Sequence, residues 1–244
     1  VALAAQLMGG VQLGTNGSFS APAEGGVLIA VFESNGSLRY ADVYAGPDFG
    51  FALSADGSVV YGLNSGIRKL DPAGGILWTD TAWGDGFVQK ISIGTTGDIV
   101  VGGLFSGAVN LGGKDLVNDD YVLELNNFDI FVGCFDSDGN HKWSIARQGA
   151  EGQTELAGVS VDAQNEVLLV YGTLLGPTFV EHLSATGNSL RVLELGAHGV
   201  SSAAIGNDAS IFVAGSSAEP ADLGGGSRPT KGDLDMWMGK VENW

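Results

Sequence analysis

Apolar and polar positions along this chain alternate in short blocks: an apolar run, a polar turn containing glycine, and a second apolar run. Four segments share this first pattern, namely VLIAVFESNGSLRY from Val27, IRKLDPAGGILWT from Ile67, DIFVGCFDSDGNHKWS from Asp129 and FVEHLSATGNSLRV from Phe179. Glycine supplies the positive φ that tight turns require, and β-branched and aromatic residues fill the flanks. The first pattern therefore predicts β-hairpins.

A second pattern alternates with the first and consists of a strand, a turn and a strand that ends in a small residue. Its copies are FALSADGSVVYG, ISIGTTGDIVVGG, VSVDAQNEVLLVYG and AAIGNDASIFVAG, with the N-terminal AAQLMGGVQLGTNG as a fifth. The chain shows no sustained helical period and no helix caps before apolar stripes. Four antiparallel strands recurring about every 40 to 50 residues are typical of propeller blades. We therefore predict an all-β fold, with residues 1–244 forming a single β-propeller domain of about five four-stranded blades.

The two ends of the chain suggest how such a ring would close. The C-terminal DMWMGKVENW matches DIFVGCFDSD, and the N-terminal LAAQLMGGVQLGTNG matches the whole second pattern. We therefore expect a closing blade shared by the N- and C-terminal segments, with Met236–Val241 antiparallel to a strand around Val11–Asn16. The strand that carries Trp78 or Trp143 in other blades is missing from this closing blade. Either that blade has three strands, or the natural chain continues.

The segments GLFSGAVNLGG, FDIFVGCFDSDGNHKWS and GVSVDAQNEVLLVYG, in this order, resemble the bacterial SBBP-type β-propeller repeat. GSSAEPADLGGGSRPTKGDLDMWMGKVENW repeats the opening half, so the resemblance covers nearly the whole chain. It implies a secreted or surface-associated bacterial protein, and it implies no single activity and no shared catalytic residues. Rings of this family often have more than five blades, which leaves the blade number open. An export signal would have to precede the given sequence, because VALAAQLMGG has no basic n-region.

Charge and composition narrow the range of partners. The chain carries 28 acidic and 11 basic residues, a formal net charge of −17. Such a surface repels nucleic-acid phosphates and anionic lipids, and no apolar run approaches the roughly 18 residues of a membrane helix. We therefore expect neither nucleic-acid binding nor membrane insertion. The single cysteine, Cys134, lies in the apolar run FVGCF and is predicted to be a buried small hydrophobe.

The sequence contains no firm catalytic motif. His141, His182 and His198 lack metal-binding spacing, no nucleophile elbow is present, and GGGSRPTKGD lacks the order of a phosphate loop. The segment DSDGN from Asp136 lacks the later ligands of a calcium loop and is interpreted as a hairpin turn. The better candidate for Ca²⁺ is a set of loop acids, with a solvated acidic loop as the alternative: Asp115, Asp119, Asp120 and Glu124. We predict no catalytic residues and no other cofactor.

In a propeller of this pattern, the tight glycine turns lie on one face and the longer connections on the other. We expect ligand-binding residues on this long-loop face, where loops vary without disturbing the core: Asp48, Trp83, Asp85, Glu151 and His198. An exposed Trp83 beside Asp80 and Asp85 would offer a sugar an apolar platform and hydrogen-bond acceptors; the alternative is a tryptophan tucked under its own blade. Trp78 and Trp143, each four residues after a turn glycine, are expected to be buried packing anchors.

These observations favour a non-enzymatic binding or scaffold module, extracellular or on the cell surface, that recognises a glycan or protein through the long-loop face. One alternative is a glycan-cleaving propeller enzyme that uses two loop carboxylates. A further alternative is a purely structural subunit, associated with another chain that completes the closing blade with a strand.

Overall fold

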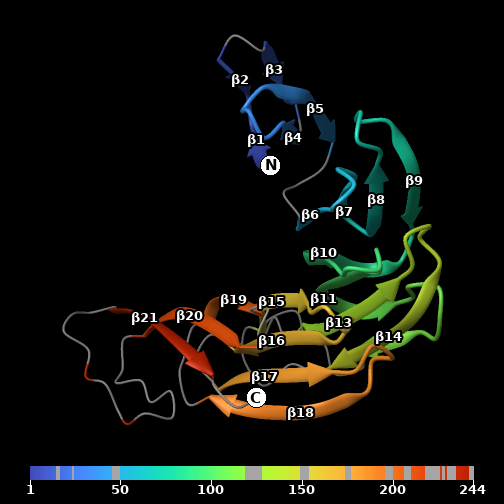
Figure 1. Ribbon diagram of the computed structural model, residues 1–244. Coiled ribbons are helices and arrows are strands. Elements are labelled where there is room, and N and C mark those ends of the chain that lie inside the picture. The colour runs from blue at the N-terminus through green and yellow to red at the C-terminus, as the bar shows by residue number, and fades with distance from the viewer. Residues whose placement is uncertain are drawn as a thin grey trace.

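The computed structural model describes residues 1–14, 17–23, 25–45, 50–118, 128–148, 154–173, 177–195, 200–205, 210–217, 226, 229 and 235–241. Within these ranges the regular structure is entirely β. Five small antiparallel sheets follow one another as the blades of a five-blade β-propeller, as the sequence predicts (Figure 1). No helix in the described ranges has the length and apolar character needed to cross a membrane.

The second, third and fourth blades each contain four strands in simple up-and-down order. The second blade consists of β6 (Phe51–Leu53), β7 (Val59–Leu63), β8 (Gly66–Leu70) and β9 (Ile76–Thr81). The third consists of β10 (Gly84–Ile93), β11 (Ile99–Val109), β13 (Asp129–Phe135) and β14 (His141–Arg147), with the short β12 (Leu116–Asn118) paired to β11. The fourth consists of β15 (Thr154–Val161), β16 (Val167–Thr173), β17 (Thr178–Leu183) and β18 (Ser189–Leu195).

Among the described residues, the first and last blades each show three strands, where four-stranded blades were predicted. The first consists of β1 (Ala2–Leu7), β4 (Gly26–Phe32) and β5 (Leu38–Ala45), with a separate hairpin of β2 (Gly10–Gln12) and β3 (Ser18–Ser20). The last consists of β19 (Val200–Ile205), β20 (Ile211–Ser217) and β21 (Asp235–Val241). By sequence pattern, β4 and β5 match β13 and β14, and β19 to β21 match β10, β11 and β13. In the part of the chain that the structure describes, the first blade thus shows no counterpart of β10, and the last blade shows no counterpart of β14.

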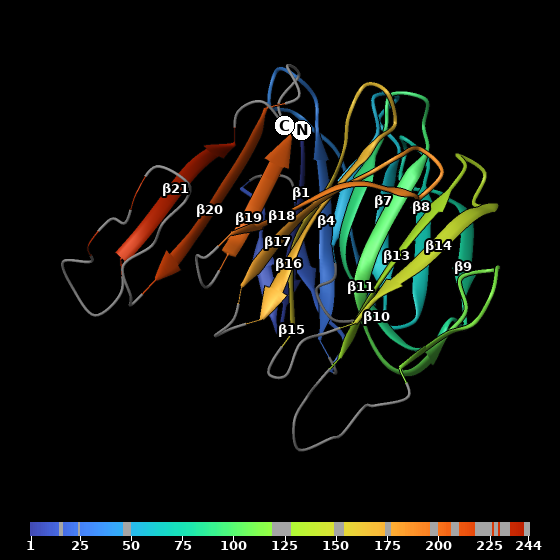
Figure 2. The same cartoon turned by 90° about the horizontal axis from the view of Figure 1, so that it is seen from below.

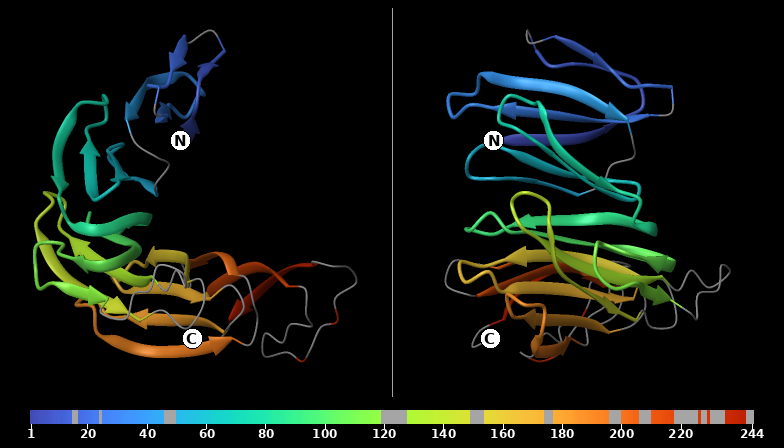
Figure 3. Two further views of the ribbon diagram at one scale, coloured as in Figure 1. Left: turned by 180° about the vertical axis from the view of Figure 1, so that it is seen from behind. Right: turned by 90° about the vertical axis from the view of Figure 1, so that its right-hand side faces the viewer.

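The predicted closing blade shared by the two ends is wrong. Val241 pairs with Ile211 inside the last blade, whereas Val11 pairs with Phe19 in the β2–β3 hairpin of the first. Each end segment therefore pairs with a strand close to it in the sequence and not with the other end of the chain. Figures 1 and 3 show the first and last blades at the two ends of an open arc.

The core is divided into four apolar clusters, one between each pair of successive blades. The cluster between the second and third blades includes Val60 and Ile67 on one side and Val88, Phe131 and Phe135 on the other. Corresponding clusters join the first blade to the second, the third to the fourth and the fourth to the fifth. Figure 2 shows the sheets of successive blades side by side. Among the described residues, no such cluster joins the fifth blade to the first.

This arrangement explains the apolar runs in the sequence. A middle strand such as β13 packs against a neighbouring blade on each face and is buried at every position. An outer strand such as β18 is mostly exposed. Cys134 lies on β13 and is buried, as predicted.

The turn that begins at Asp136 is a hairpin turn, as interpreted from its sequence. One oxygen of the Asp136 carboxylate accepts hydrogen bonds from the backbone N–H groups of Asp138 and Asn140, at 2.9 and 2.8 Å. Hydrogen bonds from the Asn140 side chain and backbone lower the pKa of Asp136. This carboxylate therefore stabilises a turn.

Candidate binding surfaces

The antiparallel topology places the turns between the first and second strands and between the third and fourth strands of a blade on one face. The connections between blades lie on the other face, together with the two-residue turn between β7 and β8. Of the predicted ligand-binding residues, Asp48, Glu151 and His198 lie outside the described residues. Asp85 is exposed near the start of β10, and Trp83 lies two positions before it. The structure therefore locates two residues of the predicted site: Asp85 is exposed to solvent, and Trp83 is buried.

Trp83 belongs to the core and is only 3% exposed. Its ring stacks on Phe135 with centroids 5.4 Å apart and meets Phe131 edge-on at 6.2 Å. The expectation of an exposed sugar platform at Trp83 is wrong, and the alternative of a tucked tryptophan applies. The physical reason is packing: the indole of Trp83 lies in the apolar cluster between the second and third blades, against Phe131 and Phe135.

The predicted calcium loop is described only in part. Asp115 accepts a 2.6 Å hydrogen bond from the side-chain amide of Asn110, within the connection that follows β11. Asp119, Asp120 and Glu124 lie outside the described residues. A calcium site at these four acids stays a prediction.

A different group of potential metal ligands lies near the tight-turn face of the fourth blade. Asp162, Glu166 and His182 each place one ligand atom within 4.8 Å of the others. His182 Nε2 is 2.9 Å from Glu166 Oε2, an ion-pair distance without the alignment of a hydrogen bond. Asp162 accepts backbone hydrogen bonds from Gln164 and Glu166 at 2.8 and 2.9 Å. These contacts give the carboxylate of Asp162 a role in stabilising the turn. The group was not identified from the sequence, because the spacing of its three residues matches no metal-ligand motif.

The third and fourth blades are joined by a buried ion pair. Arg147 Nε and Nη2 donate to the two oxygens of Glu181, both at 2.7 Å, and the Glu181 side chain is 2% exposed. Burial raises the pKa of Glu181, but hydrogen bonds from Arg147 and Ser189 outweigh that effect and leave the pKa below its usual value. Because the carboxylate is fully engaged, we assign it a structural role.

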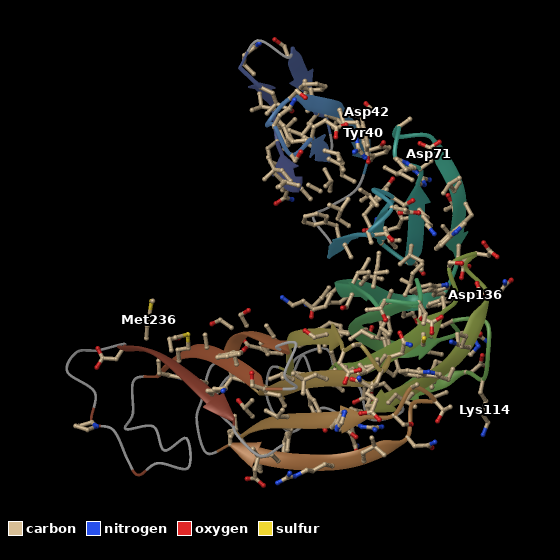
Figure 4. The ribbon with its side chains drawn as sticks, viewed as in Figure 1. Tyr40, Asp42, Asp71, Lys114, Asp136 and Met236 are labelled. Carbon is tan, nitrogen blue, oxygen red and sulfur yellow. The ribbon has the colours of Figure 1, made fainter. Side chains whose placement is uncertain are left out.

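The last blade exposes an apolar face that the sequence analysis did not identify. The β20–β21 register pairs Phe212 with Lys240, Ala214 with Met238 and Ser216 with Met236, so these side chains share one face. Met236 is 91% exposed and Met238 is 77% exposed. Figure 4 shows Met236 pointing away from the sheet on the side where the first blade lies.

The opposite face of the same sheet packs against the fourth blade. Ile211, Val213 and Trp237 belong to or contact the cluster that includes Leu168 and Val170. The exposed face of the last blade therefore corresponds to the face that other blades bury against a neighbour. In the sequence, the segment DMWMGK has apolar residues on both faces of the strand: Met236 and Met238 lie on one face, and Trp237 lies on the other.

No family model matches the sequence, and no curated protein matches it either, so membership of the SBBP repeat family is not confirmed. The structure is similar to a protein of unknown function from Bacteroides caccae, with a TM-score of 0.53 and 13% identity over 84% of this chain and 68% of that chain. This likeness shows the β-propeller fold alone.

Weaker likenesses connect the chain with two enzymes. Virginiamycin B lyase from Staphylococcus aureus gives a TM-score of 0.46 and 15% identity over 97% of this chain and 74% of that chain. Apocarotenoid oxygenase from Synechocystis gives 0.45 and 11% over 90% of this chain and 59% of that chain. At these scores neither likeness bears on catalysis in this chain.

Proposed function

We propose that this chain is a non-enzymatic binding or scaffold module that engages a protein partner through the exposed face of its last blade. The observation that carries the proposal is the pair Met236 and Met238, two large apolar side chains exposed on one face of β21. Methionine is flexible and polarisable, and it is common on surfaces that accept apolar partner groups. Neighbouring exposed apolar residues mark interaction sites more often than isolated ones.

A protein partner fits this face better than a glycan does. A sugar site needs an aromatic platform beside hydrogen-bonding groups, and Trp83 is removed from that role by its burial. Asp85 remains exposed on the long-loop face, so a ligand there stays part of the proposal as a secondary contact. The extracellular or cell-surface location implied by the resemblance is retained as part of the same proposal.

The proposal is tested by selecting a phage-displayed peptide library against the intact chain. A variant with Met236→Glu and Met238→Glu serves as the counter-target, because both side chains are exposed and their replacement leaves the core unchanged. Selected peptides should bind the original chain at least about 10-fold more tightly than the variant, since central apolar contacts dominate such interfaces. Peptides that bind both proteins equally, or a failure to select any, would contradict the proposal.

A further inference from the structure

Two carboxylates and one imidazole come together at the tight-turn end of the fourth blade. Asp162 and Glu166 lie in the turn that joins β15 to β16, and His182 lies on β17, the next strand of the sheet. One potential ligand atom of each side chain lies within 4.8 Å of the other two. All three residues are partly exposed, so an ion can reach them from solution.

The imidazole nitrogen that faces the carboxylates lacks a hydrogen bond. His182 Nε2 is buried and has no hydrogen-bond partner among the described residues. Glu166 Oε2 lies 2.9 Å from it, but not in the direction in which an N–H group would donate. Buried polar atoms without a partner are rare in folded proteins, and each requires an explanation.

The distance between these two atoms fits two ligands of one metal ion. Zinc binds imidazole nitrogen and carboxylate oxygen at about 2.0 to 2.2 Å. Two such ligands at a right angle around the ion lie about 2.9 Å apart, and two at the tetrahedral angle lie about 3.4 Å apart. The lone pair of His182 Nε2 would then point at the ion and not at the oxygen of Glu166, which accounts for the missing alignment.

The third blade provides a comparison, because its strands pair in the same register. Asp98 ends the β10–β11 turn as Glu166 ends the β15–β16 turn. Lys142 Nζ lies 2.7 Å from Asp98 Oδ2 and neutralises that carboxylate. By strand register, Leu190 occupies the position of Lys142 in the fourth blade. The carboxylate of Glu166 faces His182 instead of a lysine.

The charge and the chemistry of the ligands indicate which ion they suit. Two carboxylates balance the charge of one divalent cation, and a neutral imidazole adds a nitrogen ligand. Calcium and magnesium prefer oxygen ligands, whereas imidazole suits zinc and other transition metals. One imidazole with two carboxylates therefore favours a divalent transition metal.

We propose that Asp162, Glu166 and His182 bind one divalent transition-metal ion, with Zn²⁺ as its representative. His182 would bind through Nε2, and each carboxylate would supply one oxygen. The other coordination positions are left to water, since three protein ligands do not fill the shell of the ion. The site lies on the fourth blade and involves no residue of β21, so it is independent of the proposed function.

A bound ion would connect the turn to the neighbouring strand. His182 is opposite Leu168 in the register of β16 and β17, and Leu168 belongs to the cluster between the fourth and fifth blades. Residues opposite each other on paired strands share one face of the sheet. The ion would therefore stabilise the edge of the face against which the last blade packs.

Isothermal titration calorimetry with Zn²⁺ tests the site on the intact chain, after metals have been removed with EDTA. One ion should bind per chain, and Zn²⁺ at about 100 times its Kd should raise the melting temperature by about 5 °C or more. Ca²⁺ and Mg²⁺ at the same concentration should have a much smaller effect. An equal effect of all three ions would show a general attraction of cations to a chain with a net charge of −17, and the proposal would be wrong.

His182→Gln and Glu166→Gln each remove one ligand and keep a polar side chain. Each should weaken Zn²⁺ binding at least about 10-fold, since even changes behind metal ligands cost about that much. Asp98→Asn is the matched control, because it removes a carboxylate at the equivalent turn position of the third blade and should leave the affinity unchanged. Without the ion, all three variants should melt within about 4 °C of the original chain, which separates loss of the ion from loss of the fold.

X-ray absorption spectroscopy of the zinc-loaded chain provides a measurement that needs no variant. It should show one imidazole nitrogen together with oxygen ligands and no sulfur. A second imidazole or a sulfur ligand would place the ion elsewhere and overturn the proposal. Unchanged affinity in both His182→Gln and Glu166→Gln, or no binding of Zn²⁺ at about 1 mM, would also overturn it.

Discussion

Trp143 of the third blade donates its indole hydrogen to the backbone carbonyl of Ala185 in the fourth, at 2.9 Å. The same ring lies against Gly187, where a Cβ would be only 2.7 Å from it. Tyr40 and Trp78 lie in the same way on Gly74 and Gly139, so the contact between these blades requires a large side chain at one position and no side chain at the other. Stability across the blade interface should therefore respond to substitutions at Trp143.

Trp143→Ala should lower the free energy of unfolding by about 2 to 3 kcal/mol, less than for a fully buried tryptophan because the ring is partly exposed. Trp143→Phe keeps the packing and loses the hydrogen bond, at a cost of about 1 kcal/mol. Urea denaturation measures both. Leu190→Ala, at an exposed position on β18, is the control and should change stability by less than about 0.5 kcal/mol. A Trp143→Ala loss as small as that of the control would show that the contact of Trp143 with the Ala185–Gly187 turn contributes little to stability.

The repeat pattern and the propeller fold were predictable from the sequence because the residues that determine a hairpin turn are neighbours along the chain. Gly74 and Gly139 supply the turn conformation within a few residues of the strands that they join. Trp78 and Trp143 occupy equivalent places, as predicted, although both remain partly exposed, because they pack on turns at the rim rather than inside a sheet.

The ring closure and the binding face were not predictable in the same way. The matching patterns at the two ends suggested that Met236–Val241 completes a blade with the N-terminus, but a pattern match does not determine which equivalent strand is the partner. Trp83 was misplaced because burial depends on packing against Phe135, which is 52 residues away along the chain (135 − 83). Such contacts leave no local trace in the sequence.

The thiol of Cys134 is expected to be unreactive in the native chain, where the side chain contributes only to packing. Burial raises the pKa of its thiol to about 12, so almost no thiolate exists near neutral pH. A thiol reagent such as DTNB at pH 8 should react with the unfolded chain and leave the native chain unmodified over the same period. Rapid modification of the native protein would show that β13 opens to solvent.

The ion pair between Arg147 and Glu181 predicts a pH dependence. The pKa of Glu181 is lower in the folded chain than its ordinary value of 4.5, so the pair stabilises the fold above that pH and the contribution is lost as pH falls through the folded pKa. Glu181→Gln should cost about 3 kcal/mol at pH 7, because it removes one partner of a pair that is mostly buried. The difference between the two proteins should narrow as pH falls below about 4.5.

Urea titrations from pH 7 to pH 3 measure this dependence. Glu166→Gln is a suitable control, since its carboxylate is one-third exposed and pairs only with His182 among the described ion pairs. The control should change stability by less than about 1 kcal/mol. A constant difference between Glu181→Gln and the original chain at all pH values would show that Glu181 contributes through packing rather than through its charge.

Trp83 provides the sharpest test of where the core ends and the long-loop face begins. Trp83→Ala should destabilise the chain by about 3 to 5 kcal/mol, because the indole fills the space between the second and third blades against Phe131 and Phe135. Trp83→Phe should cost less, since a smaller ring retains part of the stacking and removes an indole nitrogen that is buried without a hydrogen-bond partner among the described residues. Asp85→Asn, two positions later on the exposed surface, should leave the melting temperature nearly unchanged. If Trp83→Ala instead left stability intact, the ring would have to lie outside the core, and the long-loop face would regain its aromatic platform.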